Sequence, residues 1–144
     1  MKEAMNEALR LLMANDIFLL ETDVAERTVA ARLACYLIPL FPGHDVDVEY
    51  NRHGVDSKRV DLPEPYRGDY SGRIYPDLIV HRRGNDERNL LVIQIKKSTN
   101  RQSRDYDRAV IRAMKMQFKY EGGLLLDLPA GPNAKDGMHK CEWL

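Results

Sequence analysis

The sequence predicts an α/β fold, a mixed β-sheet flanked by helices in the order helix, helix, strand, strand, strand, helix, strand. Helical and strand periodicities alternate along the chain, which is typical of this class. Two apolar runs, residues 73–83 and 88–98, flank a short polar turn and predict a β-hairpin. A helix and a further strand follow, and such a strand–helix–strand unit is expected to be parallel with a right-handed crossover.

The length of the chain is that of a single domain. A chain of 144 residues is long enough to bury a core of its own. We therefore expect one domain over residues 1–144, with its core at about 22–128. Residues 129–144 are expected to form a loosely ordered C-terminal tail, in which Trp143 is a candidate docking anchor.

Two helices are predicted in the first third of the chain. Residues 1–15 carry apolar side chains at helical spacing, and residues 16–22 are expected to be a connector. The second helix is expected to begin at about Asp23, because Asp23 followed three residues later by Glu26 is a capping-box pattern. The segment 39–43, with two prolines and a glycine, ends this helix.

The remaining elements follow from alternation and from turn residues. Residues 45–52 alternate between apolar and polar side chains, as a strand with one polar face does. Segment 53–72 is rich in proline, glycine and charge and predicts a long surface loop, with room for a short strand at about 58–62. Residues 103–120 predict a helix, and residues 124–128 predict a short buried strand.

Composition and charge favour a globular protein with an anionic ligand. Hydrophobic residues make up 44% of the chain, and the formal net charge is zero. Residues 51–119 nevertheless hold 16 Lys and Arg against 9 Asp and Glu, so the middle of the chain is basic between acidic ends. No apolar run approaches the roughly 18 residues of a membrane span, and no signal-peptide pattern is present. We therefore expect a cytoplasmic protein without a membrane partner.

Polar side chains interrupt the predicted hairpin at its centre. Asp77 lies in the first strand, and Gln94 and Lys96 lie on one face of the second. Neighbouring strands place such residues close together, and alternation in the preceding strand adds Glu49. A buried polar group is costly unless it is paired, so the simplest alternative is a structural ion pair between Asp77 and Lys96.

Clustered oxygen ligands beside a lysine favour a different chemistry. Carboxylate and carbonyl oxygens suit Mg²⁺ or Mn²⁺, cations that keep several waters and bridge to phosphate. A lysine next to such a cation orients a water molecule or stabilises charge on a phosphate. The pattern predicts a site for phosphodiester hydrolysis.

The segments Pro76–Asp77 and 94–96 (QIK), in this element order, resemble the PD-(D/E)xK nuclease superfamily. The resemblance covers most of the chain, from about Glu26 to Leu128, and implies a restriction-endonuclease-like core. It also implies a metal-dependent nuclease that acts on nucleic acid, with DNA as the favoured substrate and Mg²⁺ or Mn²⁺ as cofactor. Members of this kind often dimerise, and the sequence does not decide whether this chain does.

The resemblance assigns roles residue by residue. Asp77 is expected to be the central metal ligand, Lys96 the catalytic lysine, and Glu26 a helix acid that helps with metal or water. Gln94 occupies the second acidic position, where a neutral carbonyl oxygen replaces the usual carboxylate. Glu49 is added as a ligand from strand alternation alone, and it or Glu26 is expected to compensate for Gln94.

The helix at 103–120 carries a row of cations at spacings of three and four residues. This row is either a solvated face or a ridge that binds the nucleic-acid backbone. The residues assigned to backbone binding are Lys97, Arg101, Arg104 and Arg108. Three hypotheses stay open: an active nuclease, an inactive member that binds nucleic acid or a protein partner, and a plain structural domain. Gln94 is the residue that separates the first two.

Overall fold

The computed structural model describes residues 1–50, 52–53, 56–57, 59–66, 74–84 and 86–144. Its helices are α1 (Lys2–Asn15), α2 (Ile17–Glu21), α3 (Glu26–Leu37) and α4 (Asp105–Phe118), with 3-10 turns η1 (Ile38–Leu40), η2 (Asp86–Arg88) and η3 (Ala134–Asp136). Its strands are β1 (Asp45–Val48), β2 (Arg52–His53), β3 (Asp56–Ser57), β4 (Leu78–His81), β5 (Leu91–Lys97), β6 (Gly122–Leu128) and β7 (Lys140–Trp143). The predicted α/β class is confirmed.

Five strands form one mixed sheet in the order β1-β4-β5-β6-β7. The pairs β1–β4, β4–β5 and β6–β7 are antiparallel, whereas β5 and β6 run parallel on either side of α4. The predicted hairpin and the predicted parallel unit are therefore both confirmed. β2 and β3 form a separate two-stranded ribbon.

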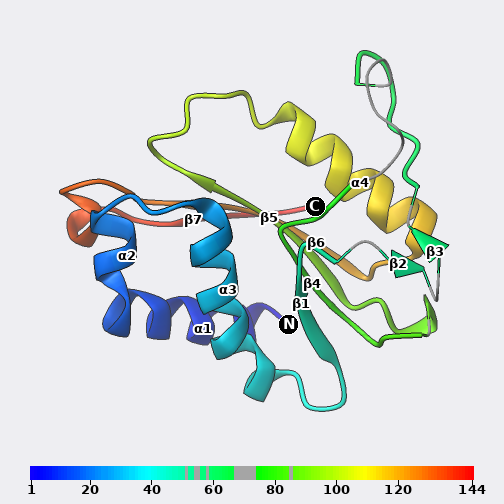
Figure 1. The fold of residues 1–144 in the computed structure, drawn as a ribbon, viewed down its shortest axis with the longest axis horizontal. Coiled ribbons are helices and arrows are strands. Elements are labelled where there is room, and N and C mark those ends of the chain that lie inside the picture. Colours follow the sequence, from blue (N-terminus) through cyan, green and yellow to red (C-terminus); the bar gives the residue numbers. More distant parts are fainter. Residues whose placement is uncertain (51, 54–55, 58, 67–73, 85) are drawn as a thin grey trace.

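The sheet separates two apolar cores. Leu91, Ile93 and Ile95 of β5 face the core that contains α1 and α3, while Val92 faces the core beneath α4. Figure 1 shows α1, α2 and α3 on one side of the sheet and α4 on the other. Because side chains alternate along a strand, Gln94 and Lys96 belong to the α4 side. That side carries the candidate site.

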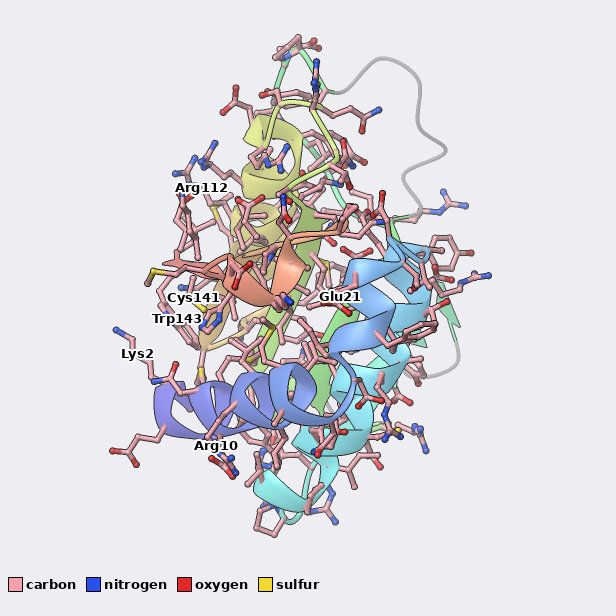
Figure 2. The ribbon with its side chains drawn as sticks, turned by 90° about the vertical axis from the view of Figure 1, so that its left-hand side faces the viewer. Lys2, Arg10, Glu21, Arg112, Cys141 and Trp143 are labelled. Carbon is pink, nitrogen blue, oxygen red and sulfur yellow. The ribbon has the colours of Figure 1, made fainter. Side chains whose placement is uncertain are left out.

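The C-terminal tail is ordered, contrary to expectation. β7 pairs with β6 from Leu124↔Trp143 to Asp127↔Lys140 and becomes an edge of the sheet. Trp143 packs against the core on the α1 side, and the ammonium of Lys2 lies 5.7 Å from the centre of its ring. Figure 2 shows Lys2 and Trp143 close together, where β7 passes the start of α1. The predicted docking role of Trp143 is confirmed.

The segment before α3 also differs from expectation. The expected connector contains α2, and α3 begins only at Glu26, with Ala25 as its N-cap and no side-chain cap. The capping box predicted between Asp23 and Glu26 is therefore wrong. Asp23 lies outside the helix in the left-handed region, at φ 53°, and its carboxylate binds another part of the chain.

The long loop is only partly described. Residues 51, 54–55, 58 and 67–73 lie outside the described residues, and so does part of the short strand expected at about 58–62. Val60, Leu62 and Ile74 are buried in the core on the α4 side. Among the described residues, each helix is too short or too polar to cross a lipid bilayer.

Gly123 sets how closely α4 approaches β6. A Cβ atom at Gly123 would lie 2.3 Å from Cγ2 of Ile111, a fully buried β-branched residue that cannot easily turn away. We expect Gly123→Ala to lower the free energy of unfolding by about 1–3 kcal/mol, measured by urea denaturation. Gly122→Ala is the matched control, because its Cβ would chiefly meet the flexible side chain of Met1. An equal loss in both variants would contradict this reason.

Candidate functional site

A pocket of about 460 Å³ opens on the α4 side of the sheet. It lies where the residues just before β4, the second half of β5 and the first turn of α4 come together. Its lining is mostly polar and consists of Tyr75, Asp77, Gln94, Lys96, Gln102, Ser103, Tyr106 and Asp107. The structure thus brings together three residues predicted from the sequence, Asp77, Gln94 and Lys96, and adds others.

Asp77 is fixed against β5 by two hydrogen bonds. The backbone N–H of Ile95 donates to Oδ2 of Asp77 at 2.7 Å, and the N–H of Asp77 donates to Oε1 of Gln94 at 3.1 Å. The pKa of Asp77 is raised to about 6, chiefly by burial and also by the nearby carboxylates of Glu26 and Asp107, while Ile95 and Lys96 oppose the shift. Ionisation of Asp77 therefore costs free energy in the folded protein.

Lys96 stands between two carboxylates. Its Nζ lies 3.3 Å from Oδ1 of Asp107 and 4.0 Å from Oε2 of Glu26. Its side chain is only 15% exposed, so these pairs are less screened than pairs on the surface. Among the described residues, the ion pairs of Lys96 go to Glu26 and Asp107, and the simple Asp77–Lys96 pair is not formed.

The pocket carries more negative than positive charge. Asp77, Glu26 and Asp107 lie around Lys96, and Arg104, the other cation that acts on Asp107, is paired with Asp127. Asp107 is 3% exposed. The pKa of Asp107 is raised by burial and by Glu26, while Lys96 and Arg104 oppose the shift. Two carboxylates are left without a matching charge when all three are ionised. A poorly hydrated excess of negative charge favours the binding of a cation.

Lys97 has a structural role instead of a surface one. Residues 96 and 97 point to opposite faces, so Lys97 turns away from the pocket and is 9% exposed. Its ammonium donates to the carboxylate of Asp23 at 2.6 Å and to the carbonyl oxygen of Val24 at 2.6 Å. The expectation that Lys97 lies on the surface and contacts phosphate is corrected, because these acceptors hold it inside the protein.

The backbone of Lys97 holds Glu26 at the site. Its Oε1 accepts hydrogen bonds from the backbone N–H of Lys97 at 3.2 Å and from Nδ2 of Asn100 at 3.3 Å. One oxygen of Glu26 thus anchors the start of α3 to the end of β5, and the other faces Lys96. Glu26 is the first residue of α3, where the helix dipole also favours an acid.

Glu49 is not among the residues that line the pocket, although its backbone N–H donates to the carbonyl oxygen of Asp77 at 3.2 Å. β1 ends at Val48, and Glu49 adopts a left-handed conformation at φ 51°, so the alternation that grouped it with Asp77 does not reach it. The guanidinium of Arg27 binds both of its carboxylate oxygens. This ion pair lowers the pKa of Glu49. The basis on which Glu49 was predicted as a ligand is therefore wrong.

The row of cations near α4 is largely paired within the protein. Arg104 binds Asp127 at 2.7 Å and three backbone carbonyls, and Arg108 binds Glu142 at 2.8 Å. Arg101 and Arg112 are exposed, and Figure 2 shows Arg112 on the surface of the molecule. Of the four residues assigned to backbone binding, Lys97, Arg104 and Arg108 thus make internal contacts. Arg101 is exposed, as are Arg112 and Lys119.

The donor set suits a cation that keeps its water. Within the described part of the chain, no three His, Cys, Asp or Glu side chains lie close enough to form a metal site on their own. Mg²⁺ and Mn²⁺ need fewer protein ligands, because one or two carboxylates, waters and substrate phosphate complete their shell. Asp77 and its neighbours fit such a cation, and they do not fit a four-ligand zinc site.

Asp107 is the residue that the sequence analysis missed. Acids such as those in segment 105–107 (DYD) are common at the start of a helix, because they interact favourably with the helix dipole. The segment therefore does not by itself indicate a site. One signal was available, since Asp107 precedes the buried stretch 109–111 and lies three residues before Val110 on its apolar stripe. An acid on the buried side of an amphipathic helix is the exception that indicates a site.

No family model, no curated protein and no solved structure shows a significant match to this chain.

The cost of charging Asp77 makes a prediction about stability. Its pKa of about 6 in the folded protein exceeds the ordinary value of 3.8, so the folded state binds this proton more tightly than the unfolded state does. Stability is therefore lost as pH rises from about 4 to 6, and it stays reduced above. In EDTA at pH 7.5, Asp77→Asn is expected to raise the free energy of unfolding by roughly 1–2 kcal/mol, with a smaller gain at pH 4.5.

Asp105→Asn is the control for that measurement. Asp105 lies in the first turn of α4, on the same side of the sheet, but it is exposed, and its pKa is lowered by Ser103 and by Arg108. We expect no gain in stability from this change at pH 7.5. A gain in both variants, or in neither, would show that the charge of Asp77 is not the cause.

Proposed function

We propose that this protein is a metal-dependent nuclease that hydrolyses phosphodiester bonds in nucleic acid, with DNA as the favoured substrate. The single observation that carries the proposal is the excess of buried negative charge around Lys96, in a pocket of nucleotide size. Carboxylates that attract a divalent cation, beside a lysine that attracts phosphate, are the parts that this reaction needs.

Each residue of the site has its own role in the proposed hydrolysis. Asp77 would be the central ligand for Mg²⁺ or Mn²⁺, and the cation would supply Lewis acidity and charge neutralisation for the phosphate. Lys96 donates hydrogen bonds to a non-bridging phosphate oxygen or to the attacking water. Hydrolysis forms a bond from the water oxygen to phosphorus and breaks one phosphorus–oxygen ester bond. The water loses a proton, and the departing oxygen gains one. We assign to Glu26, whose second oxygen lies 4.0 Å from Nζ of Lys96, the acceptance of a proton from water.

We also propose that the chain belongs to the PD-(D/E)xK superfamily and has its restriction-endonuclease-like core. Three features support it: the element order, the antiparallel β4–β5 hairpin, and the grouping of Asp77, Gln94 and Lys96 in one pocket. Arg101, which is exposed and directly precedes Gln102 of the pocket lining, is the cation that we assign to the nucleic-acid backbone.

The alternative is an inactive relative that binds nucleic acid or a protein partner. Gln94 favours it, since position 94 lacks the charge that would strengthen metal binding. The two functions differ in whether the pocket binds a cation and whether Lys96 is needed for turnover. Both differences are measurable.

Metal binding is the first test, because it requires no knowledge of the substrate. We expect isothermal titration calorimetry to detect Mn²⁺ binding to the wild type and none to Asp77→Ala. Asp136→Ala, which removes an exposed acid of η3, is the control and is expected to bind as the wild type does. The titrations are repeated with a DNA oligonucleotide present, since phosphate completes such sites. Absence of binding under both conditions would favour the inactive alternative.

Cleavage provides the second test. Single- and double-stranded DNA and RNA are incubated with the protein and Mn²⁺, and products are resolved by gel. Lys96→Ala is expected to slow cleavage at least about a hundredfold, because it removes a donor that acts on the developing charge. The control variant Lys135→Ala, which removes an exposed lysine of η3, is expected to cleave normally. Cleavage that survives Lys96→Ala would place the activity elsewhere, and melting curves check that the variant is folded.

A further inference from the structure

Gln94 presents its amino group to the pocket. Its Oε1 accepts the hydrogen bond from the N–H of Asp77, so the amide orientation is fixed by chemistry and Nε2 is the end that remains. Gln94 is 5% exposed and lines the pocket beside Asp77 and Lys96. No partner for Nε2 occurs among the described residues. Among the described residues, the fully buried side-chain atom without a partner is Oδ1 of Asn89, so Nε2 of Gln94 is open to the pocket, where it can donate to an acceptor atom of a ligand.

An amide that faces a pocket with its nitrogen does not bind a metal ion. An NH₂ group has two donors and no acceptor, whereas a cation requires an oxygen lone pair. A phosphate oxygen is the acceptor that suits this donor. The substitution of glutamine for an acid at position 94 therefore turns a ligand position into a position that recognises the anion.

Asp107 offers the carboxylate that position 94 lacks. It comes from the first turns of α4, lines the same pocket, and is 3% exposed. Its Oδ1 lies 3.3 Å from Nζ of Lys96, the residue that Glu26 also faces. An ion pair with Lys96 explains one of its oxygens, while the surplus of carboxylates around that lysine leaves negative charge to be neutralised.

We propose that Asp107 and Asp77 are the two carboxylates that hold the divalent cation, and that the amino group of Gln94 donates to a phosphate oxygen of the substrate. This inference rests on the proposed function and names two residue roles within it. The second acid of the site has moved from the sheet to the helix that covers it. The second acid would come from α4 instead of β5, so the number of acids around Lys96 would stay the same.

The test is a set of Mn²⁺ titrations by calorimetry on the full chain. Asp107→Asn is expected to weaken binding about tenfold or more, because a ligand charge is lost. Asp105→Asn, an acid on the same helix whose side chain is 65% exposed, is expected to bind within about twofold of the wild type. Because burial penalises the charge of Asp107, the neutral variant is expected to fold, and Asp107→Ser provides a second neutral variant.

Two further variants separate a ligand from a mere ion-pair partner. Asp107→Glu keeps the charge and moves the oxygens by one methylene, so a direct ligand is expected to lose affinity several-fold. Gln94→Glu replaces the amino group with a carboxylate oxygen, so it is expected to tighten binding by itself and to restore it in the double variant Asp107→Asn/Gln94→Glu. A residue that only pairs with Lys96 would give neither result.

The outcomes distinguish this inference from the proposed function. If Asp77→Ala abolishes Mn²⁺ binding while both neutral variants at position 107 bind as the wild type does, Asp107 is not a ligand and the proposed function stands. Asp107 is likewise not a ligand if Asp107→Glu binds as the wild type does or if Gln94→Glu gives no rescue. If the wild type binds no Mn²⁺ with or without DNA, the proposed function fails and this inference fails with it.

Discussion

The buried ammonium of Lys97 is the contact on which the arrangement of the site depends. It holds the carboxylate of Asp23 and the carbonyl oxygen of Val24, and so it fixes the chain just before α3 to the end of β5. Glu26 follows directly and closes on the backbone of Lys97. Because side chains alternate along a strand, fixing residue 97 on one face directs Lys96 to the other, where Asp77 and Asp107 lie. Two consecutive lysines thus do different work, one for the fold and one for the pocket.

The charges in the pocket lower the stability of the folded protein, and this cost indicates that the pocket does more than hold the fold together. Burial and neighbouring carboxylates raise the pKa of both Asp77 and Asp107, so the folded protein holds charges that a neutral core would not. Stability is sacrificed in this way where a ligand later supplies the missing charge. The paired cations along α4 show the contrast, since Arg104 and Arg108 each have acids within the chain.

The sequence predicted the parts whose cause is local. Alternation in residues 91–97 identified which face carries Gln94 and Lys96, and turn residues identified the hairpin. It failed where the cause lies far along the chain. Asp23 resembles a helix cap but binds Lys97, Glu49 extends an alternation that the backbone abandons, and the tail is held by an edge of β6. Asp107 could be recognised as unusual only once the buried face of α4 was known.

The separation of the site residues along the chain has a consequence for when the site comes into existence. Glu26 and Lys97 are 71 residues apart, and Asp107 reaches Lys96 only when α4 is packed across β5 and β6. Contacts over such distances close late, because loop entropy is lost before they form. The pocket is therefore complete only where α3, α4 and β5 are packed together. A partly folded chain would hold the same acids and the same lysine, dispersed and each surrounded by water.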